Sequence, residues 1–232
     1  MILNLSIKKK MVFAVVIWSV IILTVAMWNR ATEKRKTREL AQKEAITTFN
    51  KDQVFRFWAA NHGGVYVPIT KDTPPNPYLA HVSERDFTSP LGKKFTLMNP
   101  AYMLQQIMSE YANLNEIKGH ITSLNPINPL NKPSDWEKNA LKQFEKGVKE
   151  VSEIVSRNDE LFLKLIRPMV TTEGCLKCHA KQGYKEGDIR GGLGVSVPMK
   201  PYLVLEKTTL KNLLISLSLF WALVSCQVSI DG

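Results

Sequence analysis

The chain has 232 residues, a mass of 26.3 kDa and a formal net charge of +10 at pH 7. With 44% hydrophobic and 22% charged residues it can build a core, which excludes wholesale disorder. No fixed-period repeat is present, so coiled-coil, collagen-like and repeat architectures are poor candidates. Three cysteines are too few for a disulfide scaffold, and the basic residues are spread out without a nucleic-acid-binding motif.

The first hydrophobic segment runs from Met11 to Trp28 without a charged residue. As a helix rising about 1.5 Å per residue it would cover about 27 Å, close to the hydrocarbon thickness of a bilayer. Trp28 and Arg30 have the chemistry typical of a membrane boundary. A cleaved signal sequence, with a weak cleavage site at residues 24–26, is the alternative, but such signals have a shorter apolar region. We therefore expect an N-terminal tail and a transmembrane helix over residues 1–29.

The second uncharged segment runs from Asn212 to Ile230. A buried amphipathic helix is the alternative, but the segment has no charged face to make it amphipathic. Its length favours a second transmembrane helix over residues 212–230. The chain stops at Gly232, without the basic flank that usually marks the cytoplasmic side. We expect either a receptor that has lost its cytoplasmic output domain or a protein that signals through a separate partner.

The middle of the chain, residues 30–208, is expected to form one domain. Asn99 followed by Pro100 is a typical helix start, and Ser134 with Glu137 forms a capping box. A glycine pair, Gly63-Gly64, ends the first long helix of this domain. Its expected core contacts are Phe49, Val54, Phe55 and Trp58. The predicted elements are a helix over residues 31–60, a strand over residues 65–67, and helices over residues 99–114 and 134–146.

Strands dominate the last part of this domain. Two strands are predicted over residues 148–155 and 160–169, on either side of Arg157-Asn158-Asp159, which is a hairpin-turn composition. Leu193, Val195 and Val197 alternate in a third strand. Helices followed by an antiparallel sheet predict an α+β domain, ordered as a long helix, a mixed helical insert and three strands.

The motif Cys175-Leu176-Lys177-Cys178-His179 is C-x-x-C-H, the attachment sequence of c-type haem. Two thiols at this spacing can reach the two vinyl groups on one edge of the macrocycle, and the adjacent histidine ligates the iron. A zinc site would need a second pair of ligands, and the only other cysteine, Cys226, lies in the second hydrophobic segment. A thioredoxin-like pair would need a βαβ pattern, which is absent from the sequence. We predict covalent haem on Cys175 and Cys178, with His179 as the proximal iron ligand.

The charge pattern and the haem motif disagree on the side of the membrane. Five basic residues within 30–38 follow the first apolar segment, which by the positive-inside rule would keep the domain in the cytoplasm. Haem c is attached outside the cytoplasmic membrane, and we give this chemistry more weight. We expect a protein of the inner membrane whose domain lies on the periplasmic side.

Several short stretches carry a further and very specific signature in addition to the haem motif. They are residues 55–58 (FRFW), 62–68 (HGGVYVP), 75–79 (PNPYL), 99–103 (NPAYM), 120–124 (HITSL), 136–137 (WE), 182–184 (QGY) and 187–192 (GDIRGG). With Cys175 to His179, they resemble the Tll0287-like family of c-type haem sensory domains, formerly DUF3365, over most of residues 50–200. The resemblance implies a PAS-like fold, with an antiparallel sheet and flanking helices, between two membrane helices. It also implies a cytoplasmic histidine kinase, cyclic-dinucleotide enzyme or chemotaxis module, and no such part follows here.

The distal iron ligand is open to several interpretations. Met103 is our first choice, because it lies in the first turn of a capped helix within the family signature, although methionine also fills cores. His62, before a glycine pair, is the second choice, with the capping of carbonyl groups as its structural alternative. Water or another residue remains the third. We expect His120 to be a polar wall and His81 to be solvated.

Arg190 and Arg167 are equally good candidates for partners of the haem propionates and for ordinary surface residues. Trp136 is expected in the core. We predict a sensor input domain, not an enzyme, that responds to redox state or to a diatomic gas. A membrane-anchored electron-transfer cytochrome is the alternative; a haem enzyme has only His62 as a fair acid–base group. The expected partners are the membrane, an output or signalling protein and a second copy of the chain, with no nucleic acid.

Overall fold

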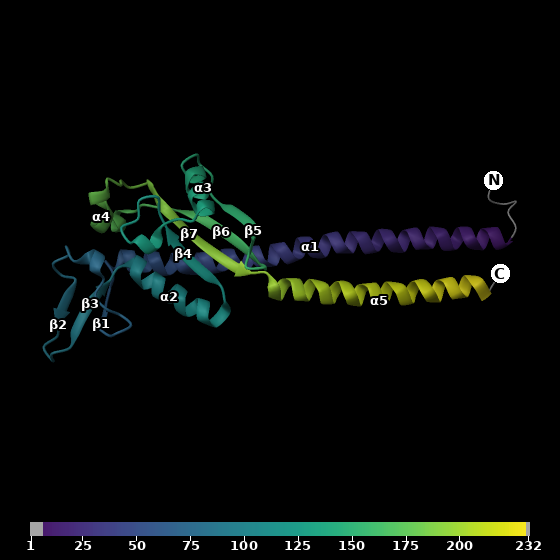
Figure 1. Ribbon diagram of the computed structural model, residues 1–232, viewed down its shortest axis with the longest axis horizontal. Helices are drawn as coiled ribbons and strands as arrows, with labels where there is room; N and C mark the ends of the chain where they lie inside the picture. The colour runs from purple at the N-terminus through teal and green to yellow at the C-terminus, as the bar shows by residue number, and fades with distance from the viewer. Residues whose placement is uncertain (1–6, 231–232) are drawn as a thin grey trace. The chain divides into compact units, whose positions relative to one another are not determined.

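The computed structural model describes residues 7–230, without the side chains of residues 177, 178 and 228–230 (Figure 1). It divides into two compact units, residues 1–41 with 199–232 and residues 42–198. Helix α1, Ile7–Asn61, is continuous and contributes to both units. The sequence predicted two separate helices in this range. The basic segment between them contains neither glycine nor proline and is rich in strong helix formers, so the helix is not interrupted.

The first unit contains two apolar helices, the N-terminal part of α1 and helix α5, Lys200–Ile230. By length and composition both could cross a membrane, and the most apolar window of each is exposed. The indole of Trp221 donates a hydrogen bond to the hydroxyl of Ser19 at 3.0 Å. The rings of Trp18 and Phe220 meet edge to face with centroids 5.2 Å apart. The apolar segments predicted from the sequence therefore form two long helices that touch each other.

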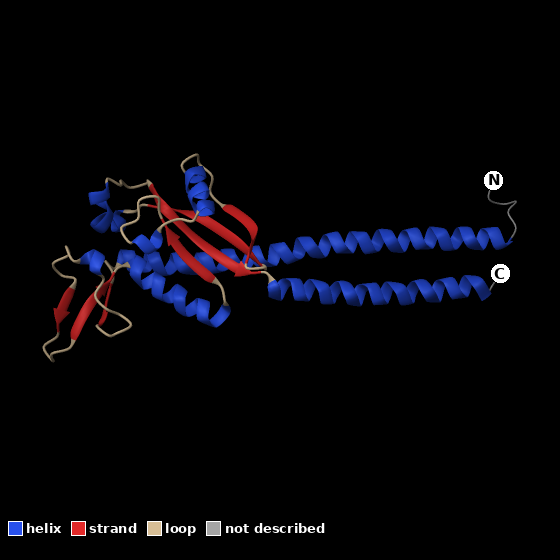
Figure 2. Ribbon diagram, viewed as in Figure 1, coloured by secondary structure: helices blue, strands red, loops and turns tan. Residues whose placement is uncertain are grey.

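The second unit, residues 42–198, covers a shorter range than the expected domain, residues 30–208. It is built on a four-stranded sheet (Figure 2). The strand order is β4-β7-β6-β5, and all pairs are antiparallel. The bounds are Lys118–Thr122 for β4, Val151–Arg157 for β5, Glu160–Val170 for β6 and Ile189–Pro198 for β7. The α+β class with antiparallel sheets is confirmed. The sequence analysis had missed β4, which contains a glycine and a histidine.

Two local predictions in this unit are confirmed. In the β5–β6 hairpin Arg157 pairs with Glu160, and Asn158 and Asp159 between them take positive φ angles of 50° and 61°. Helix α3, Asp135–Phe144, begins with the predicted capping box and buries Ala140, Leu141 and Phe144 against Ile166 of β6. Turn and cap residues act through their own backbone, so they can be recognised locally.

The predicted mixed helical insert contains a second sheet as well as its predicted helices. It has the order β1-β3-β2, with β1 at Val65–Pro68, β2 at Asp86–Thr88 and β3 at Lys94–Met98. Only β1 was predicted. Helix α2, Pro100–Asn115, follows directly, and the Asn99 side chain accepts a hydrogen bond from the backbone N–H of Tyr102, as a cap should. The remaining helices are α4, Glu173–His179, and the 3₁₀ turns η1 at Pro77–Leu79, η2 at Pro129–Asn131 and η3 at Ala180–Gln182.

The buried face of α1 differs from the predicted one. Phe49 is buried, but Val54, Phe55 and Trp58 are 65%, 41% and 52% exposed. The buried positions are the small residues Ala45 and Ala59 together with Asp52 and Arg56. The prediction assumed that aromatic residues mark the buried face, whereas here small and charged residues do.

Candidate functional site

The haem motif forms the short helix α4, which follows β6. Gly174 lies close to the backbone of α1, where a Cβ atom would stand 3.1 Å from the carbonyl oxygen of Ala60. Cys175 is 8% exposed, and its Sγ lies 3.3 Å from the hydroxyl of Thr172. Burial acts to raise the pKa of Cys175, but hydrogen bonds from Thr172 and the charges of Arg190 and Arg56 outweigh burial and lower it. The side chain of Cys178 lies outside the described residues.

His179 is held by two hydrogen bonds. Its Nδ1 lies 2.6 Å from the side-chain oxygen of Gln182, and its Nε2 lies 2.9 Å from Nη1 of Arg190. The amide oxygen can only accept and the guanidinium can only donate, so the proton must be on Nδ1 and the lone pair on Nε2. Burial, followed by the charge of Arg190, lowers the pKa of His179. The imidazole is thus neutral, and its Nε2 lone pair could bind a metal ion. The cationic guanidinium of Arg190 lies at this nitrogen in the structure.

His179 and Arg190 line a cavity of about 760 Å³, counting the part that opens to solvent. Its other walls come from η1, the first turns of α2, the end of β4, residues 125–131 and Tyr184. Tyr78 and Ile127 on its lining are exposed, so the cavity has an open mouth. The lone pair on Nε2 of His179 and the neighbouring Cys175 therefore fit a haem group attached at α4.

A smaller cavity of about 340 Å³ lies on the α1 side of the motif. Arg56, Cys175, His179 and Arg190 line it, and Asn99 and Ala101 line both cavities. Arg56 is 1% exposed, and its Nη1 points at Cys175 Sγ from 3.9 Å. The sequence analysis did not select Arg56 as a site residue. The available signal was its spacing from Phe49 and Asp52, at helical intervals of seven and four residues.

The structure does not bring the predicted distal ligands to this cavity. Met103 is half-buried on α2, whose cavity-lining residues are Ala101, Tyr102 and Gln105, and it is not among the lining residues described here. The ring of His62 is exposed, stacks on Trp58 and has its Nδ1 2.7 Å from the carbonyl oxygen of Trp58. His81, expected to be solvated, is exposed but lines the cavity together with His179.

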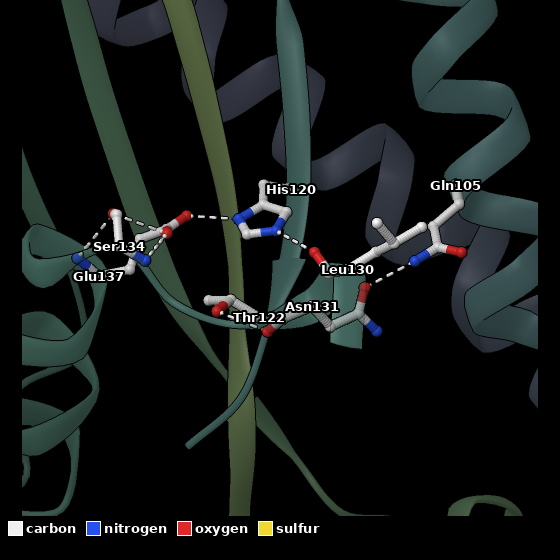
Figure 3. Close-up of polar contacts among 7 residues, drawn as sticks. All are labelled: Gln105, His120, Thr122, Leu130, Asn131, Ser134 and Glu137. Atoms are coloured by element: carbon white, nitrogen blue, oxygen red, sulfur yellow. Dashed lines mark hydrogen bonds and ion pairs between the residues drawn. The ribbon is translucent and has the colours of Figure 1, made fainter. Parts of the chain in front are cut away.

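A polar network fixes one wall of the cavity (Figure 3). The Nδ1 of His120 lies 2.7 Å from Glu137 Oε1, and its Nε2 lies 3.2 Å from the carbonyl oxygen of Leu130. The backbone N–H and the hydroxyl of Ser134 both donate to Glu137 Oε2 at 2.8 Å. Both ring nitrogens of His120 thus face acceptors, which favours the doubly protonated imidazole. The hydrogen bond with Glu137 is the main cause that raises the pKa of His120.

The same network reaches the cavity lining through Asn131. The hydroxyl of Thr122 donates to the Asn131 carbonyl oxygen at 3.1 Å, and the side chain of Gln105 donates to Asn131 Oδ1 at 2.6 Å. All three residues line the cavity. His120 does not touch the cavity among the residues described, so it positions the wall through residues 130–131.

A second polar link joins two helix starts at the cavity. Asn76 caps η1 by accepting from the backbone N–H of Tyr78, and its side-chain nitrogen donates to Asn99 Oδ1 at 3.2 Å. Asn99 in turn caps α2. Both asparagines line the large cavity.

Two residues from the sequence analysis lie elsewhere. Arg167 donates to Glu150 Oε2 at 2.8 Å from Nε and 2.7 Å from Nη2, and does not line the large cavity within the described part of the chain. The structure therefore fits Arg167 as an ordinary surface residue better than as a partner of a haem propionate. Trp136 packs against the Ala140–Phe144 cluster and donates to Glu153, as a residue at the edge of the core.

Comparison with family models matches residues 29–198 to the Tll0287-like family. The chain belongs to the Tll0287-like family. Among solved structures, the crystal structure of the cyanobacterial haem protein Tll0287 matches at 17% sequence identity and a TM-score of 0.45. The match covers 69% of this chain and 95% of the other. The comparison with curated proteins found no match. This Tll0287-like chain carries the C-x-x-C-H motif within the matched range.

Proposed function

We propose that this Tll0287-like domain binds a covalent c-type haem on Cys175 and Cys178, with His179 as the proximal ligand. The observation that carries the proposal is the neutral imidazole of His179, whose Nδ1 proton is held by Gln182 and whose Nε2 lone pair is available at the wall of the large cavity. Membership of the family named after Tll0287, which is described as a haem protein, supports it.

Different residues of the chain would orient the proximal histidine and hold the cavity wall around this group. When bound, haem supplies an iron that changes oxidation and ligation state. Gln182 holds the proton of His179 on Nδ1, which keeps Nε2 free for the iron. Arg190, which donates to Nε2 from 2.9 Å, would have to release this nitrogen for His179 to hold the iron. The network of His120 and Glu137 keeps the wall at Asn131 in place.

For the whole chain we propose a membrane-anchored sensor input module rather than an enzyme. The two apolar helices support anchoring, and the chemistry of haem c attachment favours a periplasmic domain. The family resemblance supports a PAS-like fold for this domain. Redox state or a diatomic gas would be the input. The output would pass to a cytoplasmic domain or partner, with a second copy of the chain as a further candidate. An electron-transfer cytochrome is the second candidate, because the open mouth of the cavity would expose a haem edge.

The first experiment tests covalent attachment. The full chain is produced with a c-type haem maturation system, denatured on a gel and stained for haem peroxidase activity. We expect wild-type protein to keep the stain. Cys178→Ala and the double variant Cys175→Ala/Cys178→Ala should each lose either the stain or the normal spectrum of a haem held by two thioether bonds. Cys226→Ala is the matched control and should stain like wild type. Absence of stain in wild-type protein would refute haem c binding.

A second experiment separates the sensor from the carrier. A gas sensor should bind carbon monoxide on the ferrous iron and change its spectrum. A carrier should stay six-coordinate and exchange electrons rapidly with a small c-type cytochrome. Carbon monoxide binding without rapid exchange supports the sensor, and the reverse supports the carrier.

A further inference from the structure

Arg190 lies at an irregular position of β7. The register between β6 and β7 shifts at Met169 and Val170, and Arg190 is the β7 residue that this shift leaves out of the ladder. A residue in a bulge is released from the regular alternation of a strand, and bulges commonly redirect a side chain toward a site. Arg190 lines the two cavities beside His179 and also a third cavity of about 370 Å³. Its side chain therefore borders more than one environment.

The present partner of Arg190 is the atom that an iron would need. Nη1 of Arg190 donates to Nε2 of His179 at 2.9 Å. Nε2 of the neutral imidazole has a single lone pair, so it cannot serve a guanidinium and an iron at the same time. Among the described residues, Nε of Arg190 is already buried without an acceptor. Once His179 holds the iron, Arg190 would be a cation with further N–H groups that require an acceptor.

The third cavity offers an acceptor of opposite charge. Glu145, which directly follows α3, lines this cavity together with Arg190. In the described part of the chain, Glu145 is the only acidic residue on the linings of the three cavities that Arg190 borders. Its carboxylate makes no ion pair among the described residues. Because a planar guanidinium binds a carboxylate through paired N–H donors, Glu145 is a suitable second partner.

Packing between α3 and β7 keeps this second partner close to Arg190. Ile189, which precedes Arg190, packs against the core cluster that contains Leu141 and Phe144 at the end of α3. The end of α3 is thus held against the start of β7, and Glu145 comes next in the chain. A change of partner therefore requires a rotation of the Arg190 side chain rather than a rearrangement of the two elements.

We propose that Arg190 is a positioning residue that exchanges partners with the state of His179. It bonds to Nε2 of the free imidazole, and it turns to the carboxylate of Glu145 when Nε2 holds the iron. The inference rests on the proposed haem function, which supplies the iron. Loss of the bond between iron and His179 would return Arg190 to the imidazole. The exchange takes place at the start of β7, whose other end leads through Met199 into α5.

The test is a double-mutant cycle in the full chain in detergent, with Arg190→Gln, Glu145→Gln and the double variant. It is run on the haem-loaded chain and on the chain produced without haem. The unfolding equilibrium constants should show a coupling of about threefold in the haem-loaded form, as for an ion pair at an exposed position, and none without haem. In the control cycle Glu153→Gln replaces Glu145→Gln. Glu153 is bonded to Trp136, so it should not couple to Arg190 in either form.

Carboxyl footprinting by mass spectrometry gives a second measurement that needs no unfolding. A carbodiimide and an amine label accessible carboxylates, and an ion pair with a guanidinium protects them. We expect labelling of Glu145 to be severalfold lower in the haem-loaded chain than in the haem-free chain. In Arg190→Gln the two forms should label Glu145 alike, and Glu153 should be labelled equally in all samples.

Two results would overturn the exchange while haem binding stands. A chain that stains for haem but shows neither coupling nor protection of Glu145 has no such pair. Equal coupling and equal protection in both forms would show a fixed ion pair that does not respond to His179. A wild-type chain without haem stain would instead refute the haem function, and the exchange with it.

Discussion

The second unit contains two polar clusters that differ in how their charges are matched. In the cluster of His120 and Glu137, each ring nitrogen and each carboxylate oxygen has a partner within 3.2 Å. In the cluster of Arg56 and Arg190, two buried N–H groups have none among the described residues. Buried polar groups in native proteins are nearly always hydrogen-bonded. A complete cluster therefore indicates a structural wall, and an incomplete one indicates a place for a ligand.

With haem bound as proposed, the largest effect should come from replacing the distal iron ligand, which we expect among the residues that line the large cavity. The lining favours His81 over our sequence prediction, Met103. We expect His81→Ala to turn a six-coordinate ferrous spectrum into a five-coordinate one that binds carbon monoxide readily. Met103→Ala and His62→Ala serve as controls that should keep the wild-type spectrum. A five-coordinate spectrum in Met103→Ala alone would restore the original assignment.

Removing Glu137 should break the complete cluster. Glu137→Ala leaves His120 and the N-cap of α3 without their acceptor, and should lower the free energy of unfolding by about 2–3 kcal/mol. The measurement is chemical denaturation of the haem-loaded protein. Glu153→Ala, which removes a carboxylate bonded to Trp136 at an exposed position, is the control and should cost less than about 1 kcal/mol. Equal losses in the two variants would contradict the special role of Glu137.

The pair of His120 and Glu137 should also make stability depend on pH. The pKa of His120 is raised mainly by its hydrogen bond to Glu137, which outweighs the opposing effect of burial and the smaller one of the Lys164 charge. Its contribution is complete below the ordinary value of 6.5 and is lost as pH rises through the raised pKa. Burial acts to raise the pKa of Glu137, but its hydrogen bonds to His120 and Ser134 lower it. Its contribution is therefore complete above the ordinary value of 4.5 and is lost as pH falls through the lowered pKa.

His120→Gln should accordingly lose most stability relative to wild type between pH 4.5 and pH 6.5, the ordinary values of the two groups. We expect a loss of about 1 kcal/mol there, at the low end for a charged hydrogen bond because the imidazole is partly exposed. The difference should shrink in alkaline solution. Unfolding curves of both proteins across this range test it, and a difference that grows with pH would contradict the assignment.

The smallest effect concerns Asn99, which lines both cavities and caps α2. Asn99→Ala should lower the free energy of unfolding by about 1 kcal/mol, as for other helix caps. Asn99→Asp keeps an acceptor for the backbone N–H of Tyr102 and should lose less. If Asn99→Asp is instead less stable than Asn99→Ala, the additional negative charge beside the cavity destabilises the protein by more than the helix cap stabilises it.

The elements that were predicted correctly depend on local chemistry. Asn158 and Asp159 adopt positive φ angles on their own, and the capping box at Ser134 involves residues only three apart. For these features the backbone conformation or the spacing is encoded within a few residues.

The features that escaped prediction depend on distant parts of the chain. Strand β4 contains Gly119, where a Cβ atom would lie 2.6 Å from the Met108 side chain, so its glycine reflects packing on α2 rather than a loop. The burial of Arg56 and the exposure of Trp58 depend on which side of α1 meets α4. His81 reaches the cavity because η1 is placed there by contacts with α2. Such placement follows from tertiary contacts that periodicity along one helix does not contain.

The link between Asn76 and Asn99 has a consequence for the opening motions of the domain. Each asparagine caps its own element through a backbone N–H group, Tyr78 N for η1 and Tyr102 N for α2, and the two side chains are bonded to each other. Fraying at one helix start removes a partner from the other, so the two starts should open as one cooperative unit. Amide hydrogen exchange at Tyr78 and Tyr102 should then show matching protection, although the two residues are distant in sequence. One local unfolding event would then expose both the segment that carries His81 and the first turn of α2.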